Sequence, residues 1–363
     1  QDTPNNGNLD YVTCWYKKAA NYIQGTAIEC AFVSTNSICQ GEQVAILWKP
    51  LMEQQGIKIN FAHQTFKWSN EAKGKAAVYC IIVGFSLHDR AKKQLFTYET
   101  VTSAPQPHEV KKINGYLIDA ETIFIESRTM PLCDVPVIGI GNKPIDGGNY
   151  LFTEEEKNAF VKSEPLSEKY FHKWLGSDEF INRYYRWCLY LGKCPPNELK
   201  QMPEVLKRIE AVKKFRLESK SEGTRKIAAT PTRFHVENIP DSTYVLIPEV
   251  SSEKRNYIPM GFITPDILSS NLVKIVPDAT LYHFGILTSG MHMAWMRYVC
   301  GRLKSDYRYS KDIVYNNFPW PAPTDKQKAD IEAAAQSVLD ARANYPDSSL
   351  ADLYDPDTMP ADL

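Results

Sequence analysis

Residues 76–85 read AAVYCIIVGF, an unbroken apolar run with the length of one β-strand. A run without polar alternation is typical of a strand that is covered on both faces of its sheet. Upstream, 28–36 and 57–63 are further strand-like segments, and 41–55 has helical periodicity that stops at Gly56. Strand, helix, strand, turn and strand in this order predict the trailing half of a doubly wound α/β sheet. In such sheets functional groups collect at the carboxyl ends of the strands.

The composition is that of a soluble globular protein. The chain has 363 residues, of which 43% are hydrophobic and 23% charged. It contains no apolar run near the length of about 18 residues that a membrane span needs. The first residues are polar and do not form a signal peptide. The eight cysteines form no C-x-x-C pair, and no His cluster has metal-ligand spacing. We therefore expect reduced thiols, no bound metal and a cytoplasmic location.

The net charge of −1 hides an uneven distribution. Residues 200–226 contain nine Lys or Arg against four Glu, whereas 324–363 contain three basic and nine acidic residues. Within the basic segment, 203–219 is a predicted helix with an apolar side formed by Val205, Ile209, Val212 and Phe215. Its other side carries Lys207, Arg208, Lys213, Lys214 and Arg216. These cations fit a phosphate-tracking face, and an ordinary solvated helix face explains them equally well.

Residues 291–321, MHMAWMRYVCGRLKSDYRYSKDIVYNNFPWP, mix cations and aromatic rings more densely than a packing element does. Cations contact phosphates and guanine edges, and rings stack on bases. Lys304, Asp306 and Arg308 alternate, so an extended segment would present three charged groups on one face. A charged, solvated strand is the plainer explanation. For the start of the stretch, the plainer explanation is a helix with a core-facing stripe of Met291, Trp295, Tyr298 and Val299.

A second informative stretch is 64–75, QTFKWSNEAKGK, which we predict to be a loop after the strand 57–63. It places Phe66 and Trp68 among polar and basic residues, which are Lys67, Asn70, Lys73 and Lys75. Two large rings at a strand end suit a base that is turned out of its stack. A hydrophobic plug is the competing interpretation.

The rest of the chain has a different pattern. Residues 135–150 hold four glycines, but Pro144 breaks the nucleotide-loop pattern, so we expect turns that open a new domain. Helices are then predicted at 153–161, 167–175, 178–189 and 325–344, and β segments at 244–248, 256–262, 274–276 and 282–287. Lys254 and Arg255 lie at a turn between the first two β segments. The pattern is that of an α+β domain followed by a C-terminal helix.

Several long motifs resemble those of a known family. They are FVSTNSICQGEQVAILW (32–48), HQTFKWSNEAKGKAAVY (63–79), DGGNYL (146–151), RWCLYL (186–191), VSSEKRNYIPMGF (250–262), MHMAWMRYVCGRLKSDYRYS (291–310) and VYNNFPWP (314–321). The chain resembles the MmeI-like family, large bacterial enzymes in which a nuclease and an adenine-N6 methyltransferase share one target recognition domain. The resemblance implies a partial class I methyltransferase-like sheet over 1–130, an α+β target recognition domain over 131–323 and a C-terminal helix and tail over 324–363.

Other motifs of that family do not occur in the chain. The sequence contains no Asn-Pro-Pro, the start of the family's catalytic motif, and it begins with Gln1 and not with Met. The glycine-containing loop that holds S-adenosylmethionine is also not found. We therefore expect a fragment that is inactive alone. Upstream methyltransferase and nuclease segments of the same parent chain would bind S-adenosylmethionine and perform the chemistry.

The resemblance also implies roles for particular residues toward double-stranded DNA. Phe66 corresponds best to the aromatic residue that stacks on the flipped adenine, with Trp68 as the weaker candidate. Base reading is expected from Arg302, Lys304, Asp306 and Arg308, and DNA-backbone contacts from Lys207, Lys214, Lys254, Arg255 and Arg297. A Lys donor beside an Asp acceptor would read a G·C pair. Two other functions remain open: a non-enzymatic DNA-binding specificity module that works with a separate catalytic chain, and a structural scaffold.

Overall fold

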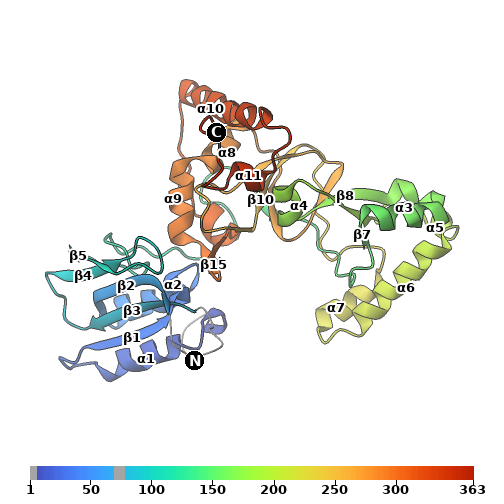
Figure 1. Ribbon diagram of the computed structural model, residues 1–363. Helices are drawn as coiled ribbons and strands as arrows, with labels where there is room; N and C mark the ends of the chain where they lie inside the picture. Colours follow the sequence, from blue (N-terminus) through green and yellow to red (C-terminus); the bar gives the residue numbers. More distant parts are fainter. Residues whose placement is uncertain (1–5, 69–77) are drawn as a thin grey trace. The chain divides into compact units, whose positions relative to one another are not determined.

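The computed structural model describes residues 6–68 and 78–363 (Figure 1). The chain divides into two compact units. The first contains the N-terminal part through Leu132 together with Ala294–Phe318, and the second contains Cys133–Met293 and Pro319–Leu363. The hairpin-bearing part of the basic, aromatic stretch at 291–321 therefore belongs to the same unit as the N-terminal sheet.

The first unit is built on a mixed five-stranded sheet with the strand order β1-β3-β2-β4-β5. Its strands are β1 (Cys30–Thr35), β2 (Lys58–Trp68), β3 (Val78–Ser86), β4 (Lys93–Thr97) and β5 (Gln106–Val110). β3 lies antiparallel between β1 and β2, and β4 runs parallel to β2. β1, β2 and β4 therefore run in the same direction, and their carboxyl ends lie at one edge of the sheet.

Helices α1 (Thr13–Tyr22) and α2 (Gln43–Lys49) pack into the hydrophobic core of this sheet. The helical spacing of Tyr16, Ala20 and Ile23 puts all three side chains in the core. The Tyr16 ring packs edge-on to Trp48 at 5.4 Å, and its hydroxyl hydrogen-bonds with the Ser34 hydroxyl at 3.0 Å. Burial of these large side chains, each worth about 1.5–3 kcal/mol, holds both helices on the sheet.

β2 is longer than its sequence predicts. The predicted strand ended at residue 63, but β2 continues to Trp68, which pairs with Val78 of β3. The pairing absorbs two β-bulges, each with one extra residue in β2. Three residues of β2 oppose two of β3 from Ile59 to Phe61, and four oppose three from His63 to Phe66. The predicted loop residues Asn70, Lys73 and Lys75 lie outside the described part of the chain.

The second unit contains two four-stranded sheets, and their strands correct two predicted helices. One sheet has the order β12-β10-β14-β6 and the other β13-β8-β9-β7. The strands are β6 (Gly139–Ile140), β7 (Leu151–Phe152), β8 (Phe171–Leu175), β9 (Arg186–Leu189), β10 (Tyr244–Pro248), β12 (Gly261–Ile263), β13 (Ile267–Ser269) and β14 (Val273–Val276), with β11 at Val250–Ser251. The segments 167–175 and 178–189, predicted to be helical, end in β8 and β9, because their aromatic residues pack into a core between sheet and helix rather than along a helix face.

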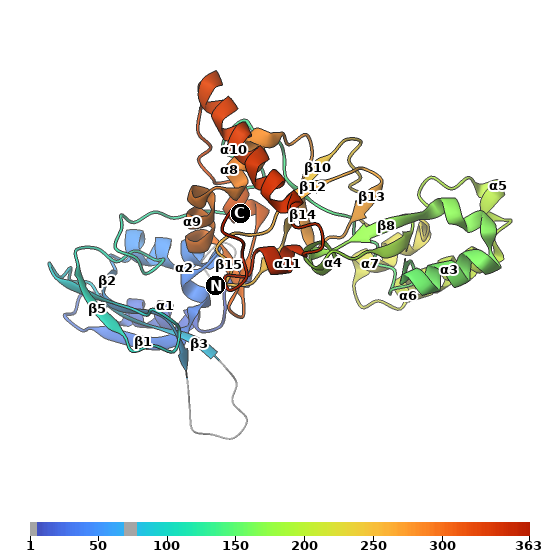
Figure 2. The ribbon, with the colours of Figure 1, turned by 45° about the horizontal axis from the view of Figure 1, so that its top comes forward.

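The helices of the second unit are mostly short. They are α3 (Glu154–Ser163), α4 (Ser177–Asn182), α5 (Pro196–Leu199), α6 (Pro203–Leu217), α7 (Glu222–Lys226), α8 (Leu281–Thr288), α10 (Asp325–Ala343) and α11 (Leu350–Leu353). α8 replaces the strand predicted at 282–287, because Thr280 and His283 form a capping box that starts a helix. α10 lies along α8 (Figure 2), where Gly285 leaves room for Ile331 and Ala335.

Candidate nucleic-acid interface

The carboxyl ends of the three strands that run together form one side of a cleft in the first unit. Gln64 and Thr65 come from the bulge in β2, and Tyr98 directly follows β4. The cleft has a volume of about 190 Å³. Its lining consists of Cys39, Gln40, Gln64, Thr65, Tyr98, Tyr116, Leu117, Ile118, Arg297, Tyr298 and Arg302. This is the edge at which α/β sheets hold their ligands.

The bulge in β2 holds its polar side chains at the cleft. The Gln64 side chain donates to the carbonyl oxygen of Leu117 at 2.8 Å, and the Asn36 amide donates to the Thr65 hydroxyl at 3.3 Å. These bonds connect the ends of β1 and β2 with the loop that follows β5. The bonded groups are polar and uncharged.

Phe66 and Trp68 lie on β2 next to this cleft and do not line it. The half-buried Phe66 ring stacks on Tyr98 at 5.5 Å, with an angle of 27° between the planes. Trp68 lies 6.3 Å from Phe66 and is 46% exposed. A ring this exposed does not plug a core, which weakens the competing interpretation for Trp68. The predicted base-stacking role of both residues stays a prediction.

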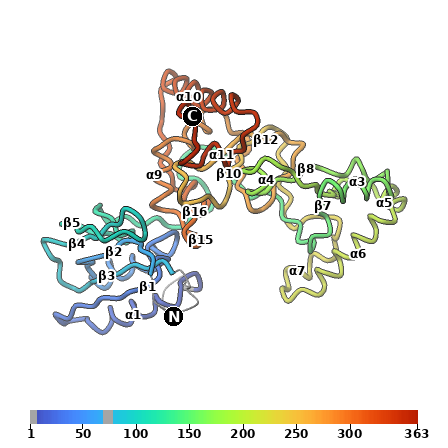
Figure 3. Tube along the Cα trace, in the orientation of Figure 1, coloured from blue at the N-terminus to red at the C-terminus, as the bar shows by residue number. Residues whose placement is uncertain are grey.

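The other side of the cleft comes from α9 (Gly290–Val299) and the hairpin that follows it. Arg297 and Tyr298 belong to α9, and Arg302 lies on β15 (Gly301–Leu303). The predicted extended segment over 304–308 is wrong, because β15 turns back into β16 (Asp306–Arg308) and the two strands lie side by side (Figure 3). The three charged residues therefore do not share one strand face: Lys304 lies in the turn, and Asp306 and Arg308 lie on β16.

The hairpin places its charged residues at the tip and along β16. Lys304 occupies the turn with a φ of 60°, the left-handed conformation that two-residue hairpin turns require. The Arg302 guanidinium donates to the Ser305 carbonyl oxygen at 2.9 Å and lies 4.0 Å over the Tyr307 ring, which fixes the turn. Lys304 and Arg308 are exposed, and Asp306 is half-buried.

Most aromatic rings of 291–321 pack inside the protein, contrary to the prediction that they are too dense for packing. The buried ones are Tyr307, Tyr309, Tyr315, Phe318 and Trp320. The predicted core-facing helix stripe is only partly correct: Val299 is buried, but Met291 and Tyr298 are exposed. Met293 and Met296 are buried on this helix in their place. By contrast, Tyr298 lines the cleft and is 56% exposed.

The predicted DNA-backbone residues outside the cleft belong to the second unit. On α6, Lys207 pairs with Glu204 at 2.7 Å and Lys214 lies 3.9 Å from Glu218, and both lysines are exposed. At the turn after β11, Lys254 is exposed and Arg255 is half-buried. Exposed ion pairs of this kind are weak, so they do not prevent these lysines from contacting phosphates.

Arg216 corrects the predicted charged face of α6. It is fully buried, and Phe215, which was placed on the apolar side, is 44% exposed. The guanidinium donates five hydrogen bonds of 2.8–3.0 Å to backbone carbonyl oxygens, which belong to Pro144, Ile145, Ile227, Thr230 and Arg233. Burial lowers the pKa of this group. Arg216 therefore holds loops together and cannot contact a phosphate.

Burial changes the pKa values of several groups at and beside the cleft. Burial raises the pKa of the Cys39 thiol to about 12, although the nearby Arg302 charge opposes the shift. Burial likewise raises the pKa of Tyr116 to about 12 and raises that of Tyr98. Burial lowers the pKa of His63, which keeps the imidazole neutral. The cleft is suited to holding an uncharged planar group near two guanidinium groups, and it supplies no general acid or base.

The cleft does not fit a metal ion or S-adenosylmethionine. Within residues 6–68 and 78–363, no group of three or more His, Cys, Asp or Glu could hold a metal. The methyl donor carries a sulfonium cation, which the charges of Arg297 and Arg302 would repel. The cleft lining, all of it in the described part of the chain, contains no carboxylate that could offset this. No methyl-transfer step can be derived from these residues.

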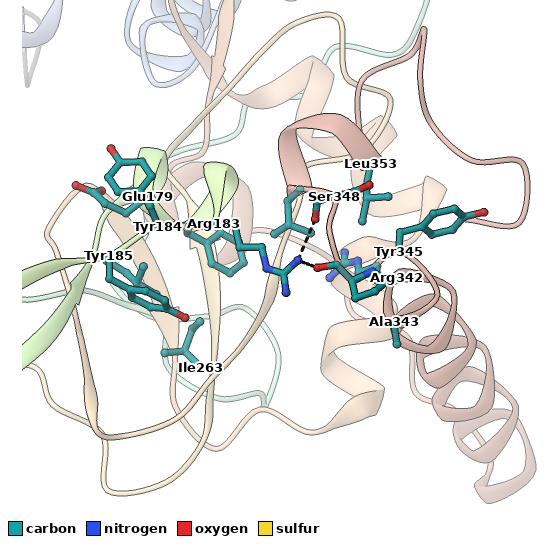
Figure 4. A pocket seen from close by; sticks show the side chains of 14 residues that line it. Glu179, Arg183, Tyr184, Tyr185, Ile263, Arg342, Ala343, Tyr345, Ser348 and Leu353 are labelled. Atoms are coloured by element: carbon teal, nitrogen blue, oxygen red, sulfur yellow. Dashed lines mark hydrogen bonds between the residues drawn. The ribbon is translucent and has the colours of Figure 1, made fainter. Parts of the chain in front are cut away.

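A second cavity, of about 360 Å³, lies within the second unit (Figure 4). The Arg183 guanidinium crosses it and donates to the backbone oxygens of Pro346 and Ser348. On its other side, Arg342 donates to the Met260 carbonyl oxygen at 2.6 Å and to the Tyr354 hydroxyl at 2.9 Å. Both arginines thus bind the C-terminal segment to the rest of the unit.

Among the residues that the structure describes, no helix has the length and apolar content to span a membrane.

Sequence reasoning missed Tyr98, Tyr116 and the bulge residues Gln64 and Thr65. Tyr98 directly follows the short strand β4 with no motif around it, and Tyr116 lies in a loop of turns. A bulge changes which face later residues occupy, and its signal in a single sequence is weak. Only the strand order brings these side chains to one edge.

Comparisons with known proteins identify a DNA methyltransferase region joined to a target recognition domain. Three family models match: "MmeI, DNA-methyltransferase domain" over residues 1–97, "MmeI, target recognition domain" over 119–322 and "MmeI, C-terminal domain" over 323–363. The chain belongs to the MmeI family. The family resemblance and the α/β fold class predicted from the sequence are thereby confirmed.

Two relatives show how much of such a protein the chain represents. It is 44% identical over 356 residues to DNA methyltransferase A of Bacillus subtilis (strain 168), covering 98% of this chain and 40% of that protein. It is 51% identical to the Type IIL restriction-modification enzyme MmeI, whose structure was solved in complex with DNA, with a TM-score of 0.96. That match covers 100% of this chain and 48% of MmeI. The chain thus spans less than half the length of either relative.

Proposed function

We propose that this chain supplies the DNA-recognition half of an S-adenosylmethionine-dependent DNA adenine-N6 methyltransferase with restriction activity. The observation that carries the proposal is the cleft at the carboxyl ends of β1, β2 and β4. There the β2 bulge and Tyr98 face Arg297 and Arg302 from the α9–hairpin segment. One wall would hold the extruded adenine next to Phe66. The opposite wall would follow the DNA strand from which that base has turned out.

The hairpin would read bases. Lys304 at the tip and Arg308 beyond it are exposed, and Asp306 lies between them, so a donor and an acceptor are presented together. These groups suit a G·C pair in the major groove, and Arg302 holds the turn in addition to its predicted base contact. Lys207, Lys214, Lys254, Arg255 and Arg297 would contact phosphates.

The division of labour follows the predicted boundaries at 131 and 324. The change of compact unit after Leu132 and the change of family match after residue 322 support this division. Methyl donor and catalytic motif would come from segments outside these 363 residues. This follows from the partial coverage of the relatives and the lack of Asn-Pro-Pro in the sequence. The chain alone would bind DNA in the bacterial cytoplasm without methylating it.

Phe66→Ala in the full-length enzyme tests the base-stacking wall. Stacking of a base on an aromatic ring contributes about 1–3 kcal/mol, so methylation should slow by roughly tenfold or more. Affinity for the duplex should change little, because the ring contacts one extruded base. Both quantities are measured on the same DNA, by methyl incorporation and by fluorescence anisotropy. Equal losses in the two would favour the hydrophobic-plug interpretation.

Salt dependence distinguishes a DNA-binding chain from a scaffold. Neutralising several phosphates releases counterions, so log Kd should rise linearly with log salt, with a slope of about 0.9 per phosphate contact. Lys214→Ala, which removes an exposed charge from α6, should lower this slope by about one contact. Lys326→Ala in α10 is the matched control with an equally exposed lysine. A flat salt dependence of the unmodified chain would rule out the phosphate contacts.

A further inference from the structure

The face of β2 that carries Phe66 is an aromatic row created by a bulge. In a regular strand, residues three apart point to opposite faces. His63 pairs with Ile82 and Phe66 with Cys80, so one extra β2 residue is inserted between them. The insertion returns Phe66 to the face of His63, and the two rings lie 6.4 Å apart in an edge-to-face contact.

β4 completes this row with two further rings. Phe96 pairs with His63 across the parallel strands, and their rings stack at 4.1 Å with planes only 2° apart. Tyr98 follows two residues later on the same face, and its hydroxyl hydrogen-bonds with His63 Nδ1 at 2.8 Å. The imidazole is thus held in its plane by one ring and tethered at its nitrogen to another.

Tyr98 is the member of this array that reaches the cleft. It lines the cleft, whereas Phe66 does not, and its ring stacks on Phe66 at 5.5 Å. Phe66 therefore has one ring face against Tyr98, and its lateral position depends on where Tyr98 is held. The hydroxyl bond to His63 restrains Tyr98 from rotating into the cleft.

We infer that Tyr98 is a positioning residue for the flipped adenine: tethered through its hydroxyl to His63, it holds the Phe66 ring in register with the cleft. The inference rests on the proposed function and deepens it. It assigns a role to a side chain that no sequence motif marks. It also gives the β2 bulge a purpose, because without the extra residue His63 and Phe66 would not share a face.

The test uses the full-length enzyme and a duplex with 2-aminopurine in place of the methylated adenine. That adenine is first located by sequencing methylated DNA from cells that express the gene. On this duplex Tyr98→Ala should lose most of the fluorescence rise that accompanies extrusion. On the matching duplex with adenine, which keeps the N6 amino group that accepts the methyl, Tyr98→Ala should lower kcat roughly tenfold or more. The duplex Kd and the unfolding temperature should stay near those of the unmodified enzyme. Tyr98→Phe keeps the ring but removes the hydroxyl bond to His63, so its fluorescence rise and kcat should fall between those of Tyr98→Ala and those of the unmodified enzyme.

Two comparisons keep this inference separate from the proposed function. Tyr79→Ala is the matched control, because its register with Lys67 puts it on the opposite face of the sheet from Phe66. If the unmodified enzyme gives no fluorescence rise, or Phe66→Ala does not reduce it, the proposed wall itself fails. If Phe66→Ala abolishes the rise while Tyr98→Ala leaves it intact, only the role of Tyr98 is refuted. If Tyr98→Ala weakens duplex binding, lowers kcat and lowers the unfolding temperature to similar extents, Tyr98 is a purely structural residue and the inference is refuted.

Discussion

Arg216→Ala is expected to destabilise the second unit by roughly 3–5 kcal/mol, because a fully buried guanidinium uses all five of its donors on carbonyl oxygens. Its removal leaves those carbonyl groups without a donor in a site with little access to water. The carbonyls come from segments at 144–145 and 227–233 that no strand joins to α6, so the loops lose their common anchor. Urea denaturation followed by tryptophan fluorescence measures the loss.

Two further variants sharpen this test. Arg216→Lys keeps the charge but presents only three donors, so its stability should fall between those of the unmodified protein and of Arg216→Ala. Lys214→Ala removes a charge from an exposed position of the same helix and should stay within about 0.5 kcal/mol of the unmodified protein. If Arg216→Ala were as mild as Lys214→Ala, the buried hydrogen bonds would contribute little.

Exchange of the two hairpin charges, Lys304→Asp with Asp306→Lys, is expected to change the preferred base pair at one position of the DNA site. Each correct bidentate contact discriminates by about 1–3 kcal/mol, so swapping donor and acceptor should favour the reversed pair by a comparable amount. The other positions of the site should keep their preferences. The measurement is the methylation pattern of a library in which every position of the site is randomised, with the full-length enzyme.

Lys254→Ala is the matched control for this exchange, because it removes an exposed lysine from another turn. Because Lys254 is proposed to contact a phosphate, Lys254→Ala should weaken binding to all sequences equally and leave the base preferences unchanged. The same uniform loss in the hairpin exchange would reassign Lys304 and Asp306 to the DNA backbone. Because Lys304 has a positive φ, the folding of the exchange variant is checked by thermal unfolding.

Periodicity identified the elements whose burial pattern is carried by their own residues. Of the apolar run, residues 78–85 lie in β3, an interior strand of the sheet, and the predicted helix that stops at Gly56 includes α2. Periodicity failed where one pattern serves two structures. The apolar segment 282–287 is hydrophobic all round and reads as a strand, yet a capping box makes it the buried helix α8.

The sequence shows how many charged residues a segment contains, but it does not show which of them are buried. Arg216 and Lys214 are two residues apart on a helix and look equivalent in the sequence, yet one is fully buried and the other is an exposed cation. The difference arises because loops distant in the sequence fold over α6 and offer carbonyl oxygens. Likewise, the alternation of Lys304 and Asp306 predicted one strand, whereas the turn bond from Arg302 makes a hairpin.

By itself, the sequence determined the α/β start, the change to an α+β pattern, the motifs of the MmeI family and Phe66 as a candidate base-stacking ring, because local patterns and long motifs carry that information. Only the tertiary structure decided that Tyr98, Gln64 and Arg302 share one cleft. Strand order brings the first two to the same edge of the sheet, and a return of the chain after residue 294 adds the third. Such neighbours are separated by dozens to hundreds of residues, and no local preference of the chain specifies them.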